Sequence, residues 1–555
     1  MSLQAHNKEH ADDLQRIKAA VSELDALCQA HVRAVAMRLA AEPESDADSY
    51  QNACYEMAFA AAEISAAHAL CDEAAAQAAP SSDLSRALAI AFAATTLPQT
   101  ILRLRLIGND VGHEEARLGP LTEVFLRAAP AARLDALGDM IIAGGDAYRA
   151  AQIDSETDMA RDMFWRLGQD IVAPLAAKIH REDLTIPDAI LTPLKEMGTF
   201  GLSIPETYGG SAPTQGSNTK SMIAITEALS AASLGAAGSL ITRPELLSRA
   251  ILKGGTPAQK TYWLPRLARG EALCAISITE PDFGSDAASL TLKATPTEGG
   301  WLLNGAKTWC TFAGKADVIM VVARTENVAG HKGLSILLVE KPPTDEHAFD
   351  VVQENGGRMR GKAIPTIGYR GMHSYDMAYE DFFVPDDNLL GGEAGRGQGF
   401  YLTMAGMTGG RIQTAARACG VMAASIDAAV QYAGDRKVFG RALGTYQLTR
   451  SRVAVMAARY RACRALAYAV AALMDEGGGQ MQASLVKLIA CRAAETVTRD
   501  ALQIFGGLGY GEETPVSRYF VDARVLSIFE GAEETLAMKV VARDLLKRAA
   551  SDADM

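Results

Sequence analysis

The chain has 555 residues, which is too long for one hydrophobic core and predicts several domains. Hydrophobic residues make up 49% of it and aromatic residues only 6%, with alanine the main apolar type, so a largely helical protein is expected. The net charge of −12, without a long basic run, argues against nucleic acid or an anionic membrane surface as a partner.

The start of the chain is polar and lacks the apolar region of a secretory signal. No stretch reaches 18 uncharged apolar residues, so no membrane insertion is expected. The eight cysteines are scattered without a Cys-x-x-Cys pair, which indicates a reducing compartment and no metal site. A cytoplasmic location is the expectation.

Residues 1–150 are rich in alanine and are predicted to be helical, with breaks at Pro80, Pro98 and Gly144. We find no catalytic cluster in this segment. It is interpreted as a helical N-terminal extension with a role in packing or assembly.

Residues 151–270 continue as helices, and residues 271–395 carry short strand-like runs such as Val318–Val322. An antiparallel β domain is predicted there, with a hairpin at Asn304-Gly305. Helical periodicity returns over residues 396–555. The predicted fold class is therefore mostly α with a central antiparallel β domain, behind the helical extension.

Near the end of the chain, Glu530 lies in the pentapeptide Ile528–Ala532, between large apolar residues and a glycine. A carboxylate in such a setting is expected to be poorly solvated, which shifts its pKa toward the working range of a general base. An isolated Phe-Glu-Gly would more often be an ordinary acid at a helix start. The neighbouring motifs decide between these interpretations.

Several separated motifs occur in one order along the chain. They are Gly201–Gly210, Ile278–Asp286, Asn304–Thr311, Arg436–Gly440, Gln503–Gly507 and the Glu530 pentapeptide. Together they resemble the acyl-CoA dehydrogenase family over about residues 155–550. The resemblance implies a helical–β–helical fold, an FAD cofactor and an acyl-CoA substrate. It also implies an electron-transfer flavoprotein as acceptor and a homo-oligomer of at least two chains that share the flavin.

The resemblance implies a role for each matching residue. Glu530 matches the family base, which removes the α proton of the thioester, and Gly410 stands where some relatives carry an alternative base. The implied cofactor residues are Ile278, Thr279, Ser285, Trp309, Thr311, Arg436, Phe439, Gln447, Gln503, Gly506, Gly507 and Ala532. The implied substrate residues are Ser285, Arg411, Gly531 and Arg243. Taken singly, most of these would be ordinary turn, core or surface residues. Ala532 departs from the threonine common in the family.

Within the family, the extension and the segment Ser239–Glu245 resemble most the (2S)-methylsuccinyl-CoA dehydrogenases of the ethylmalonyl-CoA pathway, whose product is mesaconyl-CoA. Such a substrate needs space for a branch, which the small residues Gly235–Gly238 could offer, and a cation for its carboxylate. Arg243 is a candidate cation, although a salt-bridged helix residue is an equal interpretation. The alternatives are a dehydrogenase for an uncharged short or branched acyl group, an oxidase, or a non-catalytic flavoprotein of the same fold.

Overall fold

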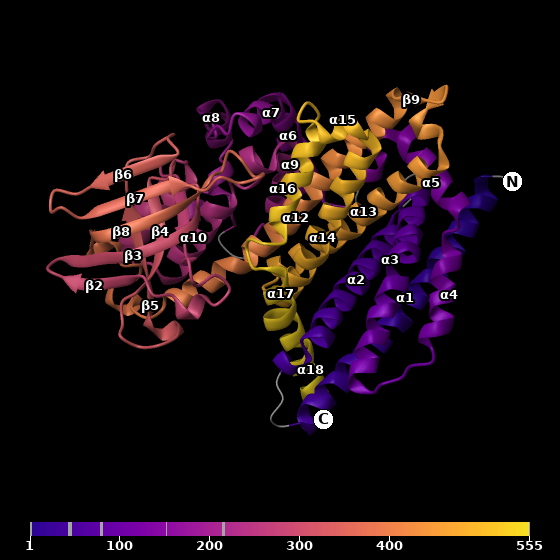
Figure 1. Ribbon diagram of the computed structural model, residues 1–555, viewed down its shortest axis with the longest axis horizontal. Helices are drawn as coiled ribbons and strands as arrows, with labels where there is room; N and C mark the ends of the chain where they lie inside the picture. Colours follow the sequence, from indigo (N-terminus) through magenta and orange to yellow (C-terminus); the bar gives the residue numbers. More distant parts are fainter. Residues whose placement is uncertain (1–2, 43–46, 78–81, 151–152, 214–216, 554–555) are drawn as a thin grey trace. The chain divides into compact units, whose positions relative to one another are not determined.

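The structure is a computed structural model whose described residues are 3–42, 47–77, 82–150, 153–213 and 217–553. The chain divides into two compact units (Figure 1). One unit joins residues 1–159 to residues 414–474 and 478–555, so the N-terminal extension and most of the C-terminal helices share one body. The other unit contains residues 160–413 and 475–477.

The unit that contains both chain ends is built almost wholly from helices (Figure 1). They are α1 (Leu3–Ala41), α2 (Gln51–Ala76), α3 (Ser82–Val111), α4 (Leu118–Ala128), α5 (Ala131–Gly144), most of α12 (Gly399–Asp435), α13 (Gln447–Asp475), α14 (Gln480–Phe505), α15 (Gly507–Tyr510), α16 (Pro515–Leu526), α17 (Glu533–Thr535) and α18 (Arg543–Ala553). A π-helical segment, Leu536–Ala542, joins α17 to α18, and β9 (Lys437–Val438) pairs with β10 (Arg441–Ala442).

Small side chains allow these helices to pack closely. Most buried residues of α2 are alanine, and α2 lies beside α3 and α14 (Figure 1). A Cβ atom added to Gly138 of α5 would lie 2.1 Å from the carbonyl oxygen of Arg450, so the extension meets α13 at backbone contact distance.

Buried polar groups also join the extension to the C-terminal helices. The Tyr148 hydroxyl donates to Asp427 at 2.7 Å, and the Arg461 guanidinium donates to the Tyr148 carbonyl at 3.0 Å. Arg461 also pairs with Glu73 of α2. These contacts form inside one core, where an unpaired partner would be costly.

The predicted breaks in the extension have different outcomes. Gly144 ends α5 as expected, and Pro80 lies outside the described residues. Pro98 was expected to break a helix and instead lies inside α3, because a proline removes only one backbone hydrogen bond and packing can offset that loss. Residues 83–111 of α3 are long and apolar enough to cross a bilayer, but 61% of the apolar stretch is buried, as in a core helix.

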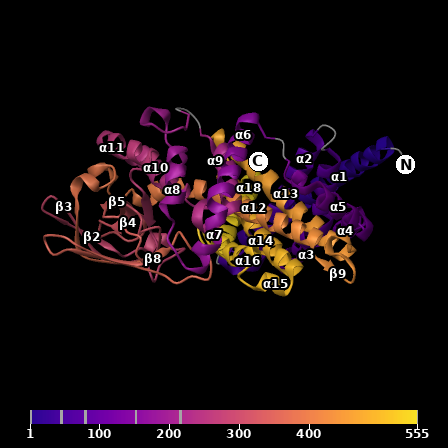
Figure 2. The ribbon, with the colours of Figure 1, turned by 90° about the horizontal axis from the view of Figure 1, so that it is seen from above.

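The second unit places helices beside one sheet (Figure 2). Its helices are α6 (Ser155–Leu167), α7 (Ala173–Arg181), α8 (Asp188–Glu196), α9 (Thr219–Ala232), α10 (Thr242–Gly254) and α11 (Pro257–Ala268), with a π-helical segment at Leu234–Gly238. Its strands are β1 (Cys274–Ser277), β2 (Lys293–Thr297), β3 (Gly300–Thr311), β4 (Val318–Arg324), β5 (Leu334–Glu340), β6 (Ala348–Val352), β7 (Arg358–Ala363) and β8 (Ser374–Pro385).

The eight strands form a sheet in the order β1-β4-β2-β3-β8-β7-β6, with β5 also paired to β4. Most pairs are antiparallel, but β1 and β2 both pair with β4 in parallel. The predicted antiparallel domain thus also contains two parallel pairings, because the chain passes through β2 and β3 before it returns beside β1. Helices α10 and α11 pack on one face of β4 and β5, as in the cluster of Leu247, Trp263 and Met320. The expected class, mostly helical around a central β domain, is confirmed.

The Asn304-Gly305 pair does not form the predicted hairpin. Both residues lie inside β3, and the turn between β2 and β3 falls at Glu298-Gly299 instead. Gly305 has a φ of 134° where the register of β3 on β8 shifts. The glycine therefore serves a β-bulge, which uses the same conformational freedom as a tight turn.

Candidate active site

Trp309 lies in β3 at an irregularity of the pairing with β8. The register shifts between Lys307 and Cys310, and Trp309 itself has a φ of 57°. A positive φ is uncommon for a bulky residue, and at a bulge it re-aims the side chain. Trp309 is 54% exposed in the single chain. An exposed indole on a rigid strand is suited to cover a flat aromatic ligand.

The segment from Ile278 to Ser285 runs beside this strand. The Thr308 amide donates to the Thr279 carbonyl at 2.9 Å, which places Thr279 next to the bulge. Ile278 and Thr279 are half-buried and Ser285 is exposed. The Thr311 hydroxyl is buried and shares a 2.8 Å hydrogen bond with Ser374, so its position is fixed by β8.

A buried ion pair holds the same segment, and sequence analysis missed it. Lys307 donates to the Ile278 carbonyl at 2.7 Å and to the Glu280 carboxylate at 2.8 Å. Both side chains are almost completely buried. Burial alone would raise the pKa of Glu280, but the Lys307 charge and hydrogen bonds hold it below its usual range. The pair therefore fixes the Ile278–Thr279 backbone against β3.

Glu530 lies in the turn between α16 and α17 with a φ of 55°. This left-handed conformation is rare for a residue with a side chain and is a feature of functional sites. The expected apolar enclosure is incomplete in the single chain, because Glu530 is half-buried and Ile528 is 54% exposed. The flanking residues follow one another in sequence but do not surround the carboxylate in space. Gly531 (φ 102°) and Ala532 are half-buried beside it.

Three polar residues of α14 hold this turn. Buried Lys487 donates to the Gly531 carbonyl at 2.7 Å, and Glu495 accepts from the Ser527 hydroxyl at 2.5 Å. Arg492 donates to the Glu533 carboxylate at 2.5 Å. The only sequence signal for Lys487 is a charge inside the apolar run Leu485–Ala490.

The residues expected near the flavin of a neighbouring chain are all exposed in the single chain. They are Arg436, Phe439, Gln447, Gln503, Gly506 and Gly507. Phe439 is 98% exposed, and a Cβ atom added at Gly506 or Gly507 would meet nothing within 4 Å. The segment that contains Arg436 and the segment that contains Gly506 are joined by a ring stack of Tyr432 on Phe505, whose centroids are 4.1 Å apart. Guanidinium, amide and open backbone together suit a phosphate-bearing cofactor such as FAD.

The residues expected at the acyl group lie on α10, α12 and the π-helical segment before α10. Arg243 is 6% exposed and donates to the Ser239 carbonyl at 3.3 Å, while Arg411 is half-buried on α12. The small residues do not leave the expected space. A Cβ atom added to Gly235 would lie 2.3 Å from the Arg370 carbonyl oxygen, and one added to Gly238 would lie 2.2 Å from the Ser230 hydroxyl. These glycines serve close packing rather than a cavity.

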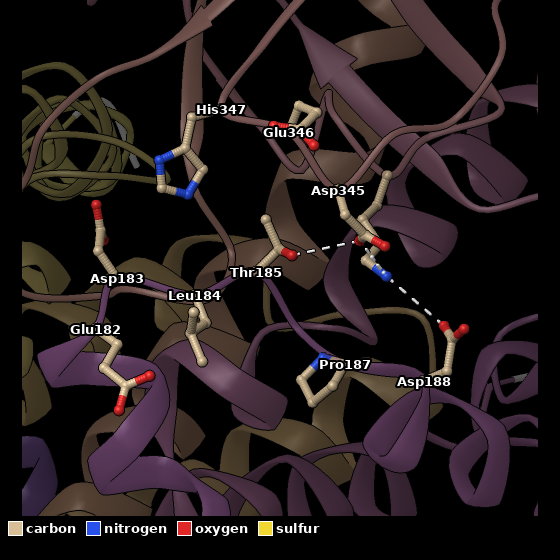
Figure 3. A pocket seen from close by; sticks show the side chains of 10 residues that line it. Glu182, Asp183, Leu184, Thr185, Pro187, Asp188, Asp345, Glu346 and His347 are labelled. Carbon is tan, nitrogen blue, oxygen red and sulfur yellow. Dashed lines mark hydrogen bonds and ion pairs between the residues drawn. The ribbon is translucent and has the colours of Figure 1, made fainter.

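A separate pocket lies between α7, α8 and the loop before β6, and it contains none of the predicted residues (Figure 3). Asp183, His347 and His373 offer ligand atoms within 4.8 Å of one another there, a group that sequence analysis missed. Asp183 already accepts from His373 at 3.1 Å and lies 3.5 Å from the Arg370 guanidinium. Because the Asp183 charge is balanced in this way, we propose no metal at this place.

Comparison with known proteins identifies the family of the chain. Three family profiles match in order: the N-terminal domain of acyl-CoA dehydrogenase over residues 154–271, the middle domain over 275–382 and the C-terminal domain over 397–546. A (2S)-methylsuccinyl-CoA dehydrogenase from Cereibacter sphaeroides is 41% identical over 80% of this chain and 79% of its own length.

More distant relatives match a shorter part of the chain. A mitochondrial isovaleryl-CoA dehydrogenase from Oryza sativa subsp. japonica is 32% identical over 71% of this chain and 92% of its own. The solved structure of butyryl-CoA dehydrogenase from Megasphaera elsdenii superposes with a TM-score of 0.65 at 30% identity, covering 71% of this chain and 99% of that one. The chain belongs to the acyl-CoA dehydrogenase family, whose members are FAD-dependent enzymes acting on the CH–CH bond of acyl-CoA thioesters.

Proposed function

We propose that the protein oxidises (2S)-methylsuccinyl-CoA to mesaconyl-CoA, as a step of the ethylmalonyl-CoA pathway in the cytoplasm. The observation that carries this proposal is the 41% identity to an enzyme of that name over 80% of the chain. The relatives named for isovaleryl and butyryl substrates share less identity and cover less of the chain.

In this reaction Glu530 is the general base. Its carboxylate takes the α proton of the thioester, and the negative charge that develops on the thioester oxygen is stabilised by the backbone N–H of the same residue. The bound FAD supplies the acceptor for the β hydride. The left-handed Glu530 backbone and the Lys487 contact to Gly531 hold this base in one orientation.

The flavin is assigned to residues of the β domain, of the turn at Glu530 and of the exposed C-terminal segments described above. Trp309 would cover the ring, and the same cofactor would be held by Ile278, Thr279, Ser285, Thr311 and Ala532. Arg436, Phe439, Gln447, Gln503, Gly506 and Gly507 reach the flavin of a second chain in a homo-oligomer. An electron-transfer flavoprotein is the proposed electron acceptor. Ser285, Arg411 and Gly531 are assigned to the acyl-CoA.

Arg243 is the proposed cation for the distal carboxylate of the substrate. It is a buried arginine near the start of α10, in the segment that resembles the methylsuccinyl-CoA enzymes. A distal carboxylate beside this guanidinium would form a buried ion pair that a neutral substrate cannot form. Losing one partner of a buried pair costs about 3–5 kcal/mol, which corresponds to roughly a hundredfold or more in specificity.

The test compares kcat/KM for methylsuccinyl-CoA, isovaleryl-CoA and butyryl-CoA with an artificial electron acceptor. We expect a preference of roughly a hundredfold or more for the dicarboxylate. Arg243→Ala should narrow that preference, while Arg243→Lys keeps the charge and should retain more of it. Equal values for the three substrates would reject the dicarboxylate and favour the uncharged short or branched substrate.

A further inference from the structure

One side chain of the N-terminal extension reaches the catalytic turn. The Tyr55 hydroxyl of α2 donates to the Glu533 carboxylate at 2.5 Å. Glu533 is the first residue of α17 and follows Glu530 by three positions. The two partners are 478 residues apart in sequence, so this contact exists only because the extension packs on the C-terminal helices.

Arg492 of α14 completes a three-way contact. The same guanidinium nitrogen donates to the Tyr55 hydroxyl at 2.6 Å and to the Glu533 carboxylate at 2.5 Å. The guanidinium also lies 3.8 Å from the ring centre of Phe59, one helical turn after Tyr55. Because Phe59 is 1% exposed, the extension offers Arg492 a fixed aromatic surface as well as a hydroxyl.

The position of Glu533 controls the end of the turn that carries Glu530. The Glu533 amide donates to the Ser527 carbonyl at 3.1 Å, which closes the turn from Ser527 to Ala532. The turn contains two residues with positive φ, Glu530 and Gly531, and such a backbone persists only where its surroundings hold it. A carboxylate fixed at Glu533 therefore restrains the backbone that aims the Glu530 side chain.

We propose that the N-terminal extension positions the catalytic base, with Tyr55 as a positioning residue that acts through Glu533 and Arg492. This inference rests on the proposed role of Glu530. It revises the expectation that the extension serves packing or assembly alone. Tyr55 acts as a hydrogen-bond donor at any working pH, because burial and then the Glu533 contact raise its pKa to about 12.

The direct test is Tyr55→Phe, which removes the hydroxyl and keeps the ring. Tyr50→Phe is a matched control, because the Tyr50 hydroxyl bonds only within the described extension, to Glu42 at 2.9 Å and Arg38 at 3.0 Å. For both full-length holoenzymes we would measure flavin content, oligomer mass, kcat, KM and the single-turnover rate of flavin bleaching by the acyl-CoA substrate.

We expect Tyr55→Phe to lower kcat and the bleaching rate by about tenfold, because a small misplacement of a base costs rate even when binding is kept. KM, flavin content and oligomer mass should stay as in the wild type, and Tyr50→Phe should change none of these values. Glu533→Gln should lower kcat and the bleaching rate by a similar factor. The double variant Tyr55→Phe, Glu533→Gln should lose less than the product of the two single losses, since the two residues act through one contact.

Two results would overturn the inference. One is a wild-type bleaching rate in Tyr55→Phe, and the other is a loss of flavin or of oligomer mass that accounts for the whole loss of rate. Failure of the proposed function looks different. In that case no acyl-CoA bleaches the wild-type flavin, or Glu530→Gln bleaches as fast as the wild type.

Discussion

The β domain holds one set of the predicted site residues and the C-terminal helices hold another, and each uses a buried lysine to do so. In the β domain, Lys307 donates to the Ile278 carbonyl at 2.7 Å. In the C-terminal helices, Lys487 donates to the Gly531 carbonyl at the same distance. Each lysine thus fixes the backbone of a motif that is expected to touch the flavin or the substrate.

The surroundings of the two lysines differ. Lys307 forms an ion pair with Glu280 inside a sheet whose register already restrains the motif. The turn at Glu530 has no strand pairing, and α14 and Tyr55 of the extension hold it through side chains. A motif on a sheet therefore depends on one strong buried pair, whereas a motif in a turn depends on several contacts from distant parts of the chain.

The largest expected loss of rate comes from removing the base itself while the contacts that hold its turn are kept. Glu530→Gln keeps the shape of the side chain and removes its basicity, and losing a positioned base typically costs roughly 10²–10⁴-fold in rate. We expect flavin content to stay normal, because Glu530 is expected to touch the substrate rather than to bind the cofactor. Turnover close to the wild-type value would contradict the assignment of Glu530.

The next largest effect tests the ion pair of the β domain. Lys307→Met leaves Glu280 buried without its cation, which should lower the free energy of unfolding by about 3–5 kcal/mol and weaken flavin retention. The double variant Lys307→Met, Glu280→Gln should recover part of that loss. Chemical denaturation of the two variants is the measurement. A double variant that is as unstable as Lys307→Met alone would mean that the Lys307–Glu280 interaction does not contribute to the free energy of unfolding.

The same pair predicts a dependence on pH. A carboxyl whose pKa is lower in the folded protein than its usual 4.5 stabilises the fold above about pH 4.5, and this stabilisation is lost as pH falls through the folded pKa. The difference in stability between wild type and Lys307→Met should therefore shrink in acid. A constant difference from pH 7 to pH 3 would exclude this linkage.

Sequence analysis located the motifs but not the groups that hold them. The strand runs at Val318–Val322 and the helical periodicity were sufficient for the fold class, because local hydrophobic spacing carries that information. The parallel pairing of β1 with β4 and the contact of Tyr55 with Glu533 depend on long-range packing, which no local pattern records. The hairpin predicted at Asn304-Gly305 was wrong because a β-bulge and a hairpin turn both use the conformational freedom of glycine.

Two sets of expectations remain predictions. The division of the chain at residues 150, 270 and 395 and the roles of the individual site residues stay predictions.

The prediction of open space beside Gly235 and Gly238 was wrong. A glycine in the sequence is equally consistent with an open cavity and with a tightly packed backbone, and the structure shows the second. The residues that matched the family by motif were visible in the sequence, whereas Lys487 and Arg492 lie on α14 well before its motif, which begins at Gln503.

A smaller effect tests whether the turn at Glu530 needs its own lysine. Lys487→Met leaves the Gly531 carbonyl without this donor in a partly buried place, at a cost of about 1–3 kcal/mol. We expect kcat to fall by about tenfold, since the turn that carries the base loosens. Lys539→Met is a control, because Lys539 is exposed and pairs with Asp48 on the surface. A wild-type kcat for Lys487→Met would mean that Lys487 is not needed to hold the turn that carries Glu530, unlike the role proposed for Lys307 in the β domain.

Arg436 tests the part of the site assigned to a second chain. Since Arg436 is exposed, Arg436→Ala should leave the fold of the single chain intact. We expect flavin content and oligomer mass to fall together, because the cofactor would bridge two chains. Flavin titration with mass measurement in solution checks this. Loss of flavin without any change of oligomer would place Arg436 at the cofactor but not at the interface.

The smallest effect on the protein itself should come from Trp309. Because it is 54% exposed, Trp309→Phe should change the free energy of unfolding of the apoprotein by no more than about 0.5 kcal/mol. Its effect should appear only when FAD binds. Of the four tryptophans, Trp263 and Trp301 are almost fully buried and Trp165 is half-buried, so we expect the exposed Trp309 to account for most of the fluorescence quenching on reconstitution, through its contact with the flavin. Trp309→Phe should remove most of that quenching while the β domain keeps its stability. Unchanged quenching would place the flavin away from this strand. Lys307 would then no longer be a lysine that fixes a flavin-binding motif, and the comparison with Lys487 would not hold.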